Sequence, residues 1–122
     1  MIKAFLAVGL GGAFGSMLRY GISLFFARWN PAGFPWATLL ANLNGCFLIG
    51  LFMAYATKEP NWDSNMRLLA ITGFCGGYTT FSTFAFENVQ FIKSGQLGLA
   101  LAYTLGSLVF GGLLVYLGMQ FK

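Results

Sequence analysis

The sequence predicts an all-α integral membrane protein with four transmembrane helices. Hydrophobic residues make up 57% of its 122 residues and charged residues only 8%, which is more apolar than a soluble domain. The mean hydropathy is +0.71. A helix needs about 20 apolar residues to cross the hydrocarbon core, and four windows reach that length: residues 4–27, 36–57, 68–92 and 97–121. They occupy most of a single four-span domain over residues 1–122.

Short polar connectors separate the windows and contain all three prolines of the chain. Because proline removes a backbone donor and clashes with the preceding turn, it belongs outside a spanning helix. Trp29, Trp36 and Trp62 lie near window ends, where interfacial aromatic residues are common. These features favour four spans over two longer ones.

The first window contains a close-packing pair and one deep basic residue. Gly11 and Gly15 form a small-xxx-small pair, which lets helices approach closely in lipid. Arg19 is the deepest basic residue of the chain. At that depth it attracts anions, holds a helix end or extends its side chain to the interface.

The second window holds two asparagines that do not share one environment. Asn42 and Asn44 are two positions apart, which separates their side chains by about 200° around a helix. We expect one of them to pack and the other to function. The ordinary role of asparagine in a membrane, an interhelical hydrogen bond, remains the alternative for either residue.

The third window predicts a broken helix and the functional centre. Residues 76–84, with the sequence GGYTTFSTF, place glycines, hydroxyls and two phenylalanines at membrane depth. Lipid supplies no hydrogen bonds, so backbone groups freed by a break at the glycines need protein or water as partners. Phe81 and Phe84 share one helical face, where they pack or offer positive ring edges to an anion. Glu87, the only acid in a span, pairs with a base, gates a vestibule or supports packing.

The fourth window adds hydroxyl groups. Tyr103 and Ser107 lie one turn apart on one face. Together with Thr38, Ser82 and Thr83 they offer a sparse ladder of donors, such as an anion that sheds its water would need. Sparse hydroxyls are also ordinary packing residues, so both interpretations stay open.

Lysine and arginine are divided almost evenly between the two ends of the predicted bundle. Lys3, Lys58, Arg67 and Lys122 fall at one end, and Arg28 and Lys93 at the other, joined by Arg19 if it extends that way. So small a bias predicts insertion in both orientations, and two opposite copies would pair about a two-fold axis in the membrane plane. Four packed helices leave little interior space for a water-lined route, which also favours a dimer. The net charge of +4 suits anionic lipid rather than nucleic acid.

Three segments occur in an order that matches a known family. They are GGAFGSMLRY at residues 11–20, TLLANLNG at residues 38–45 and GFCGGYTTFSTF at residues 73–84, followed by Tyr103 and Ser107. With these motifs the chain resembles the Fluc/CrcB fluoride channels along essentially its whole length. The third motif is highly specific, and Ser16 stands where the family often has alanine.

The resemblance implies a passive fluoride-selective channel that exports fluoride across the bacterial cytoplasmic (inner) membrane and lowers fluoride toxicity. It implies an antiparallel dual-topology homodimer with two pores between the subunits. The implied pore residues are Phe81 and Phe84 through their ring edges, Asn42 through its side-chain N–H, and Thr38, Ser82, Tyr103 and Ser107 as a polar route, with Arg19 and Glu87 as electrostatic or vestibule residues. A structural sodium ion at the dimer centre is implied on the backbone carbonyls of Gly76 and Thr79.

Other classes of protein remain as alternatives. Four-span exporters of the small multidrug resistance type have a similar length, but they need an acid in the first span, and this chain has none there. A membrane scaffold that moves no ion is a third interpretation. An enzyme is not expected, because the chain has no histidine and its sequence predicts no metal-ligand cluster or nucleophile–base pair.

Overall fold

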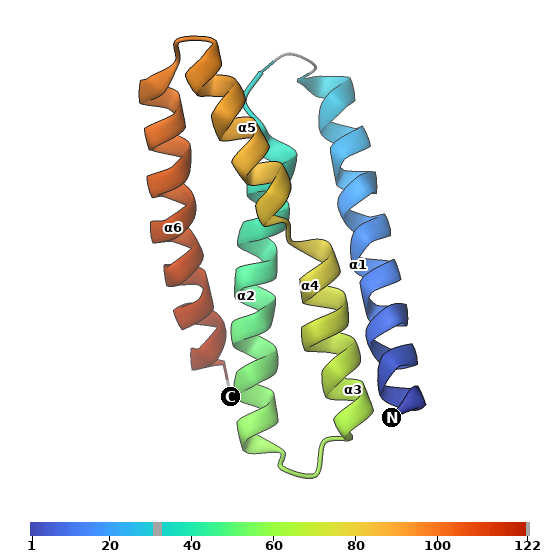
Figure 1. Ribbon diagram of the computed structural model, residues 1–122. Coiled ribbons are helices and arrows are strands. Elements are labelled where there is room, and N and C mark those ends of the chain that lie inside the picture. Colours follow the sequence, from blue (N-terminus) through green and yellow to red (C-terminus); the bar gives the residue numbers. More distant parts are fainter. Residues whose placement is uncertain (31–32, 122) are drawn as a thin grey trace.

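The structure, a computed structural model, describes residues 1–30 and 33–121. Its helices are α1 (Ile2–Trp29), α2 (Trp36–Lys58), α3 (Ser64–Arg67), the π-helical segment η1 (Leu68–Cys75), α4 (Gly76–Tyr78), α5 (Phe81–Lys93) and α6 (Leu97–Gln120). No strand occurs among the described residues. The helices run side by side, with the start of α1 and the end of α6 at the same end of the bundle (Figure 1). The predicted all-α architecture is confirmed.

Three of the four predicted spans are unbroken helices. α1, α2 and α6 are each long and apolar enough to cross a membrane. The third window is instead divided: α3, η1 and α4 follow one another without interruption, and α5 begins after a break. Neither half reaches the length of about 20 residues that a span needs, so the third span requires both.

The break lies at two threonines rather than at the glycines where we expected it. Thr79 and Thr80 have extended backbone, with ψ angles of 159° and 121°, whereas Gly76 and Gly77 are helical. β-Branched threonine tolerates extended backbone well. Gly77 serves close packing instead, because a Cβ atom there would lie 2.5 Å from the carbonyl oxygen of Gly12.

The break lets the third span change its partner. Its first half, η1 and α4, packs against α1, while α5 packs mainly against α6, which also packs along α2 (Figure 1). The contact with α1 is backbone to backbone: a Cβ atom on Gly73 would lie 2.7 Å from the carbonyl oxygen of Val8, and one on Gly15 would lie 2.7 Å from the amide nitrogen of Tyr78. Glycines of the first and third windows therefore meet within one chain.

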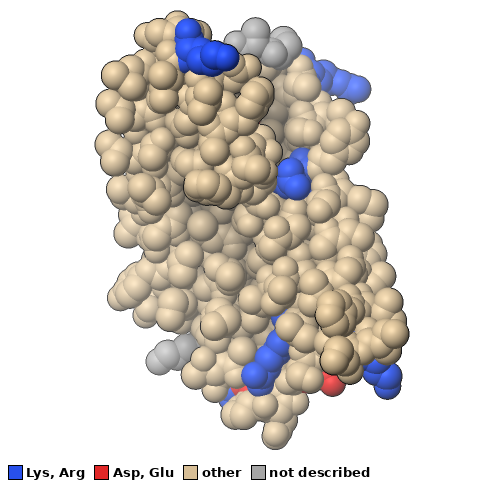
Figure 2. Space-filling model, in the orientation of Figure 1, with Lys and Arg blue, Asp and Glu red and all other residues tan. Residues whose placement is uncertain are grey.

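The outer surface suits hydrocarbon. Figure 2 shows basic side chains at both ends of this face and an uncharged middle, apart from one recessed basic side chain. Large apolar side chains cover the outer faces of α1 and α6; Phe14 is 62% exposed and Phe110 is 57% exposed. Lys122, counted among the basic residues at one end of the bundle, and Pro31, one of the three connector prolines, lie outside the described residues.

Candidate functional site

Asn42 of α2 clamps the helix break. Its side-chain oxygen accepts a hydrogen bond from the backbone N–H of Thr80 at 2.8 Å, and its amide nitrogen donates to the carbonyl oxygen of the same residue at 3.2 Å. The hydroxyl of Thr80 in turn accepts from the backbone N–H of Thr83 at 3.2 Å and caps α5. The amide nitrogen of Asn42 carries two hydrogens, so one donor remains after this clamp.

The break diverts the helical partners of two backbone carbonyls. In a continuous α-helix the carbonyls of Gly76 and Thr79 would accept from the N–H groups of Thr80 and Thr83. Those two N–H groups donate instead to Asn42 and to the Thr80 hydroxyl. Gly76 is exposed, and a Cβ atom there would meet nothing within 4 Å. Two carbonyl oxygens are thus freed from the helix, and the residue that carries one of them, Gly76, is exposed.

Arg19 and Ser16 reach the neighbouring carbonyl from α1. The Nε atom of Arg19 donates to the carbonyl oxygen of Gly77 at 3.2 Å, and the hydroxyl of Ser16 donates to the same oxygen at 3.4 Å. This oxygen lies in the last turn of α4, where a cation is favoured by the helix dipole. Within the chain, Arg19 therefore holds a helix end, that of α4.

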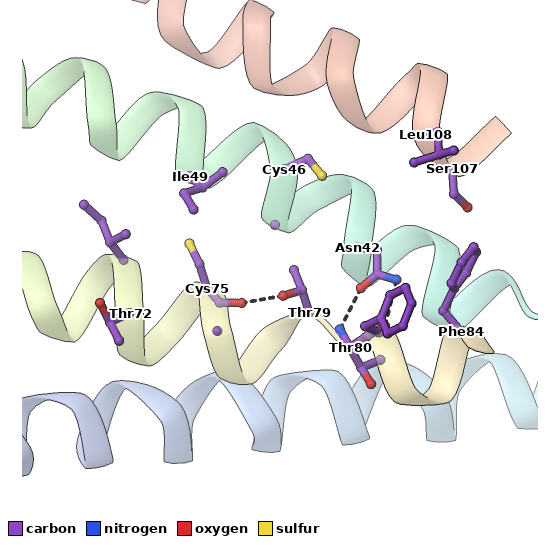
Figure 3. A pocket seen from close by; sticks show the side chains of 14 residues that line it. Asn42, Cys46, Ile49, Thr72, Cys75, Thr79, Thr80, Phe84, Ser107 and Leu108 are labelled. Carbon is purple, nitrogen blue, oxygen red and sulfur yellow. Dashed lines mark hydrogen bonds between the residues drawn. The ribbon is translucent and has the colours of Figure 1, made fainter. Parts of the chain in front are cut away.

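A groove of about 630 Å³ runs along the break. Side chains from α2, η1, α5 and α6 line it (Figure 3). Six of the predicted site residues share this lining: Asn42, Gly76, Thr79, Phe81, Phe84 and Ser107. The hydroxyl oxygen of Ser107 is buried and has no hydrogen-bond partner among the described residues. The groove therefore combines two aromatic rings, one spare amide donor and one unused hydroxyl.

The two phenylalanines of the groove differ in their surroundings. Their ring centroids are 6.1 Å apart. Phe81 is 80% exposed, whereas the ring of Phe84 packs 4.9 Å from the ring of Tyr103. One wall of the groove is therefore anchored to α6, and the other projects out of the chain.

A second polar cluster lies next to Phe84, around Glu87. Its carboxylate accepts hydrogen bonds from the hydroxyl of Thr38 at 2.8 Å and from the hydroxyl of Tyr103 at 2.7 Å. Thr38 and Tyr103 are both buried. Glu87 is half-buried and forms no ion pair with the described residues; its hydrogen bonds join α5 to α2 and α6.

Glu87 also borders a second hollow of about 310 Å³, which is lined by residues from the end of α1, the start of α2 and α5. The described residues that line it include Ser23, Asn30, Phe34 and Gln90. Contacts therefore run continuously from the groove through Phe84 and the Glu87 cluster to this second hollow.

Two polar residues of the predicted spans, Ser82 and Asn44, belong to neither the groove nor the Glu87 cluster. Ser82 is exposed, does not line the groove, and has its hydroxyl 3.4 Å from that of Thr80. Asn44 donates to the hydroxyl of Tyr78 at 3.1 Å. The two asparagines therefore have different partners, as the sequence predicted, although both make hydrogen bonds to the third span.

Sequence reasoning missed the Thr80 cap and one polar pair. The hydroxyl of Thr104 donates to the side-chain oxygen of Asn88 at 3.1 Å, which links α6 to α5. Both residues are polar and lie inside predicted spans, where polar groups usually face protein or water. That signal was available, but it did not show that the two residues meet.

Nearly the whole chain matches one protein family. The family model described as "CrcB-like protein, Camphor Resistance (CrcB)" matches residues 6–119. The chain belongs to the CrcB family. The match includes every residue assigned above to the break, the groove and the Glu87 cluster.

Curated CrcB-family relatives carry a uniform description. The chain is 48% identical to a protein of Bordetella avium over 94% of this chain and 89% of the relative. It is 43% identical to a protein of Thermus thermophilus over 98% and 93% of the two chains. A protein of Azobacteroides pseudotrichonymphae is 41% identical over 97% of this chain and 94% of its own length. Each is named "Fluoride-specific ion channel FluC".

Proposed function

We propose that this CrcB-family protein is a passive fluoride-selective channel rather than an enzyme, and that it exports fluoride across the bacterial cytoplasmic membrane. The observation that carries the proposal is the groove at the helix break, where Phe81, Phe84, Asn42 and Ser107 meet in an otherwise apolar bundle. The names of the relatives point to the same ion. Export by such a channel lowers the fluoride concentration in the cytoplasm.

The groove offers what a dehydrating fluoride ion needs. Fluoride is small and strongly hydrated, so a pore must replace its water with donors yet release it again. Asn42 has one N–H left, and the hydroxyl of Ser107 has no partner among the described residues. Ring edges of Phe81 and Phe84 add positive electrostatic potential without binding the ion as tightly as a full charge would.

Beyond Phe84 the proposed route follows the Glu87 cluster. Thr38 and Tyr103 are the hydroxyl donors there, and both already donate to Glu87. Fluoride that passes this point therefore competes with the carboxylate for the same two hydroxyl groups. Ser82 and Arg19 do not line the groove. Ser82 lies near the start of α5, and the positive charge of Arg19 attracts anions towards the break.

A second, antiparallel copy of the chain completes the proposed pores. Phe81 projects out of the chain with 80% of its surface exposed, so this wall of the groove is free to pack against a second copy. The nearly even division of basic residues between the two ends permits both orientations in the membrane. A two-fold axis in the membrane plane then places two equivalent pores between two subunits.

A structural sodium ion at the centre of this dimer fits the residues present. Carbonyl oxygens are suitable ligands for a hard cation, and those of Gly76 and Thr79 have lost their helical partners beside the groove. A bound sodium ion would supply positive charge that offsets these carbonyl dipoles. The proposal predicts that purified dimer is more thermostable in sodium chloride than in N-methylglucamine chloride, and equal stability in both would contradict it.

The decisive experiment is fluoride efflux from liposomes that contain the purified protein, followed with a fluoride electrode. Vesicles loaded with chloride and vesicles without protein are the controls. We expect rapid fluoride efflux that is independent of an imposed pH gradient. Assembled protein that releases no fluoride would refute the channel, and efflux that requires a proton gradient would indicate a coupled exporter instead.

A further inference from the structure

α5 carries both aromatic residues of the groove but is only weakly anchored by apolar burial. It has 13 residues, and none of them is buried within the described chain. The break separates it from the tightly packed first half of the span, and its main neighbour is α6. Its position must therefore depend on a small number of side-chain contacts with α6 and α2.

Two neighbouring polar contacts join α5 to α6. One is the hydrogen bond from Tyr103 to Glu87, which belongs to the site described above. The other lies one residue further along both helices, where the hydroxyl of Thr104 donates to the side-chain oxygen of Asn88 at 3.1 Å. We call this second contact, from Thr104 to Asn88, the α5–α6 bridge.

The α5–α6 bridge ends at the backbone of Phe84. The amide nitrogen of Asn88 donates to the carbonyl oxygen of Phe84 at 3.1 Å. This contact also fixes the orientation of the amide, because a flipped side chain would point its oxygen at another acceptor. Its oxygen is then left facing the hydroxyl of Thr104, so one side chain ties α6 to the residue that bears the aromatic ring.

We propose that Asn88 and Thr104 are positioning residues for Phe84. The α5–α6 bridge holds the backbone of Phe84 against α6, where its ring packs 4.9 Å from that of Tyr103. The inference rests on the proposed role of Phe84 in the pore. Fluoride and chloride differ in radius, so a ring held at a fixed distance from the donors of the groove excludes the larger ion. A loosened ring admits both ions.

The test removes the bridge without changing the shape of its residues much. Thr104→Val deletes the hydroxyl, Thr104→Ser retains it, and Asn88→Leu removes the bridge from the other side. Thr57→Val is the matched control, because among the described residues the hydroxyl of Thr57 donates only to the carbonyl of Met53 in its own helix. Fluoride and chloride efflux are measured from the same vesicles, and assembly is checked by size-exclusion chromatography.

We expect Thr104→Val and Asn88→Leu to assemble and to lower the ratio of fluoride to chloride efflux. The loss should be about 3- to 15-fold, the range that one hydrogen bond between membrane helices corresponds to. The double variant should lose no more than either single variant, because both remove the same bridge. Thr104→Ser and Thr57→Val should retain the wild-type ratio.

Three results would overturn the inference, and they differ from one another. An unchanged ratio in both Thr104→Val and Asn88→Leu, with Phe84→Ile impaired, would refute the positioning role alone. Normal efflux through Phe84→Ile would remove Phe84 from the pore and this inference with it. Absence of fluoride efflux from wild-type vesicles would refute the proposed function itself. If Thr104→Val does not assemble, Asn88→Leu gives the same test from α5.

Discussion

The two halves of the third span are held in opposite ways. η1 and α4 contact α1 through glycines, at distances that leave no room for a Cβ atom. α5, in contrast, has no buried residue. It is joined to α2 and α6 by hydrogen bonds that Glu87 accepts from Thr38 and Tyr103 and that Asn88 accepts from Thr104. Backbone packing makes the first half a rigid support, whereas directional polar contacts hold the half that carries the aromatic rings.

The difference has a physical basis in the membrane. Lipid is as apolar as leucine, so helices associate by close packing of small residues or by hydrogen bonds between polar ones. Close packing tolerates no added atom, and its loss is felt throughout the interface. A hydrogen bond is worth less, but it fixes the angle at which a side chain is presented.

The largest effect is expected from a methyl group in the rigid half. A Cβ atom on Gly15 would lie 2.7 Å from the backbone nitrogen of Tyr78, and backbone cannot move aside as a side chain does. We predict that Gly15→Ala costs about 3 kcal/mol, as overpacking does, and abolishes the monodisperse peak in size-exclusion chromatography. The control is Gly9→Ala, because a Cβ atom on Gly9 meets nothing within 4 Å. Equal behaviour of the two variants would contradict the close contact.

The next effect concerns the ring of Phe84 in α5. We predict that Phe84→Ile assembles normally but slows fluoride efflux by at least about tenfold, equivalent to about 1.4 kcal/mol on the barrier, because isoleucine has no positive ring edge. The matched control is Phe86→Ile in the same helix. Phe86 is 59% exposed and lies outside the groove. A similar loss in both variants would mean that α5 as a whole, and not this ring, had been disturbed.

A smaller effect on stability is expected at the clamp of the break. Asn42→Ala removes two hydrogen bonds to the backbone of Thr80, which at membrane depth is worth about 1 kcal/mol in total. Asn44→Ala removes one bond, to Tyr78, and should cost about half as much. Thermal unfolding in detergent checks the order. Because only Asn42 lines the groove, only Asn42→Ala should also slow fluoride efflux.

The sequence predicts the contacts of η1 and α4 better than those of α5. Window length, proline position and the glycine pair are local signals, and they predicted four spans and the close packing of Gly11 and Gly15. Gly76 and Gly77, in contrast, led us to place the break too early, because a glycine that packs and a glycine that interrupts a helix look alike in sequence. The phenylalanine pair was visible because i, i+3 spacing is local as well.

The contacts of α5 depend on which helix faces meet, and no local pattern carries that information. Asn88 and Thr104 are 16 residues apart on two helices joined by a turn at Gly95, the one described residue with a positive φ. Their meeting depends on the path of that turn and on how far the break displaces α5. The hydrogen bonds of Glu87 to Thr38 and Tyr103 likewise join three helices, so neither partner was predictable for Glu87 from its neighbours in sequence.

The smallest effect is expected where the two halves meet. Gly77 ends the glycine contact with α1, and its carbonyl oxygen also accepts hydrogen bonds from Arg19 at 3.2 Å and from Ser16 at 3.4 Å. Since Ser16 is exposed and its bond is the longer one, Ser16→Ala should cost less than about 0.5 kcal/mol and leave fluoride efflux unchanged. Arg19→Gln should slow efflux more, because it removes the charge at the helix end as well as weakening the bond. If Ser16→Ala slowed fluoride efflux as much as Arg19→Gln, the number of hydrogen bonds to the carbonyl of Gly77 would matter more than the charge of Arg19. The end of α4 would then be held by hydrogen bonds, as α5 is.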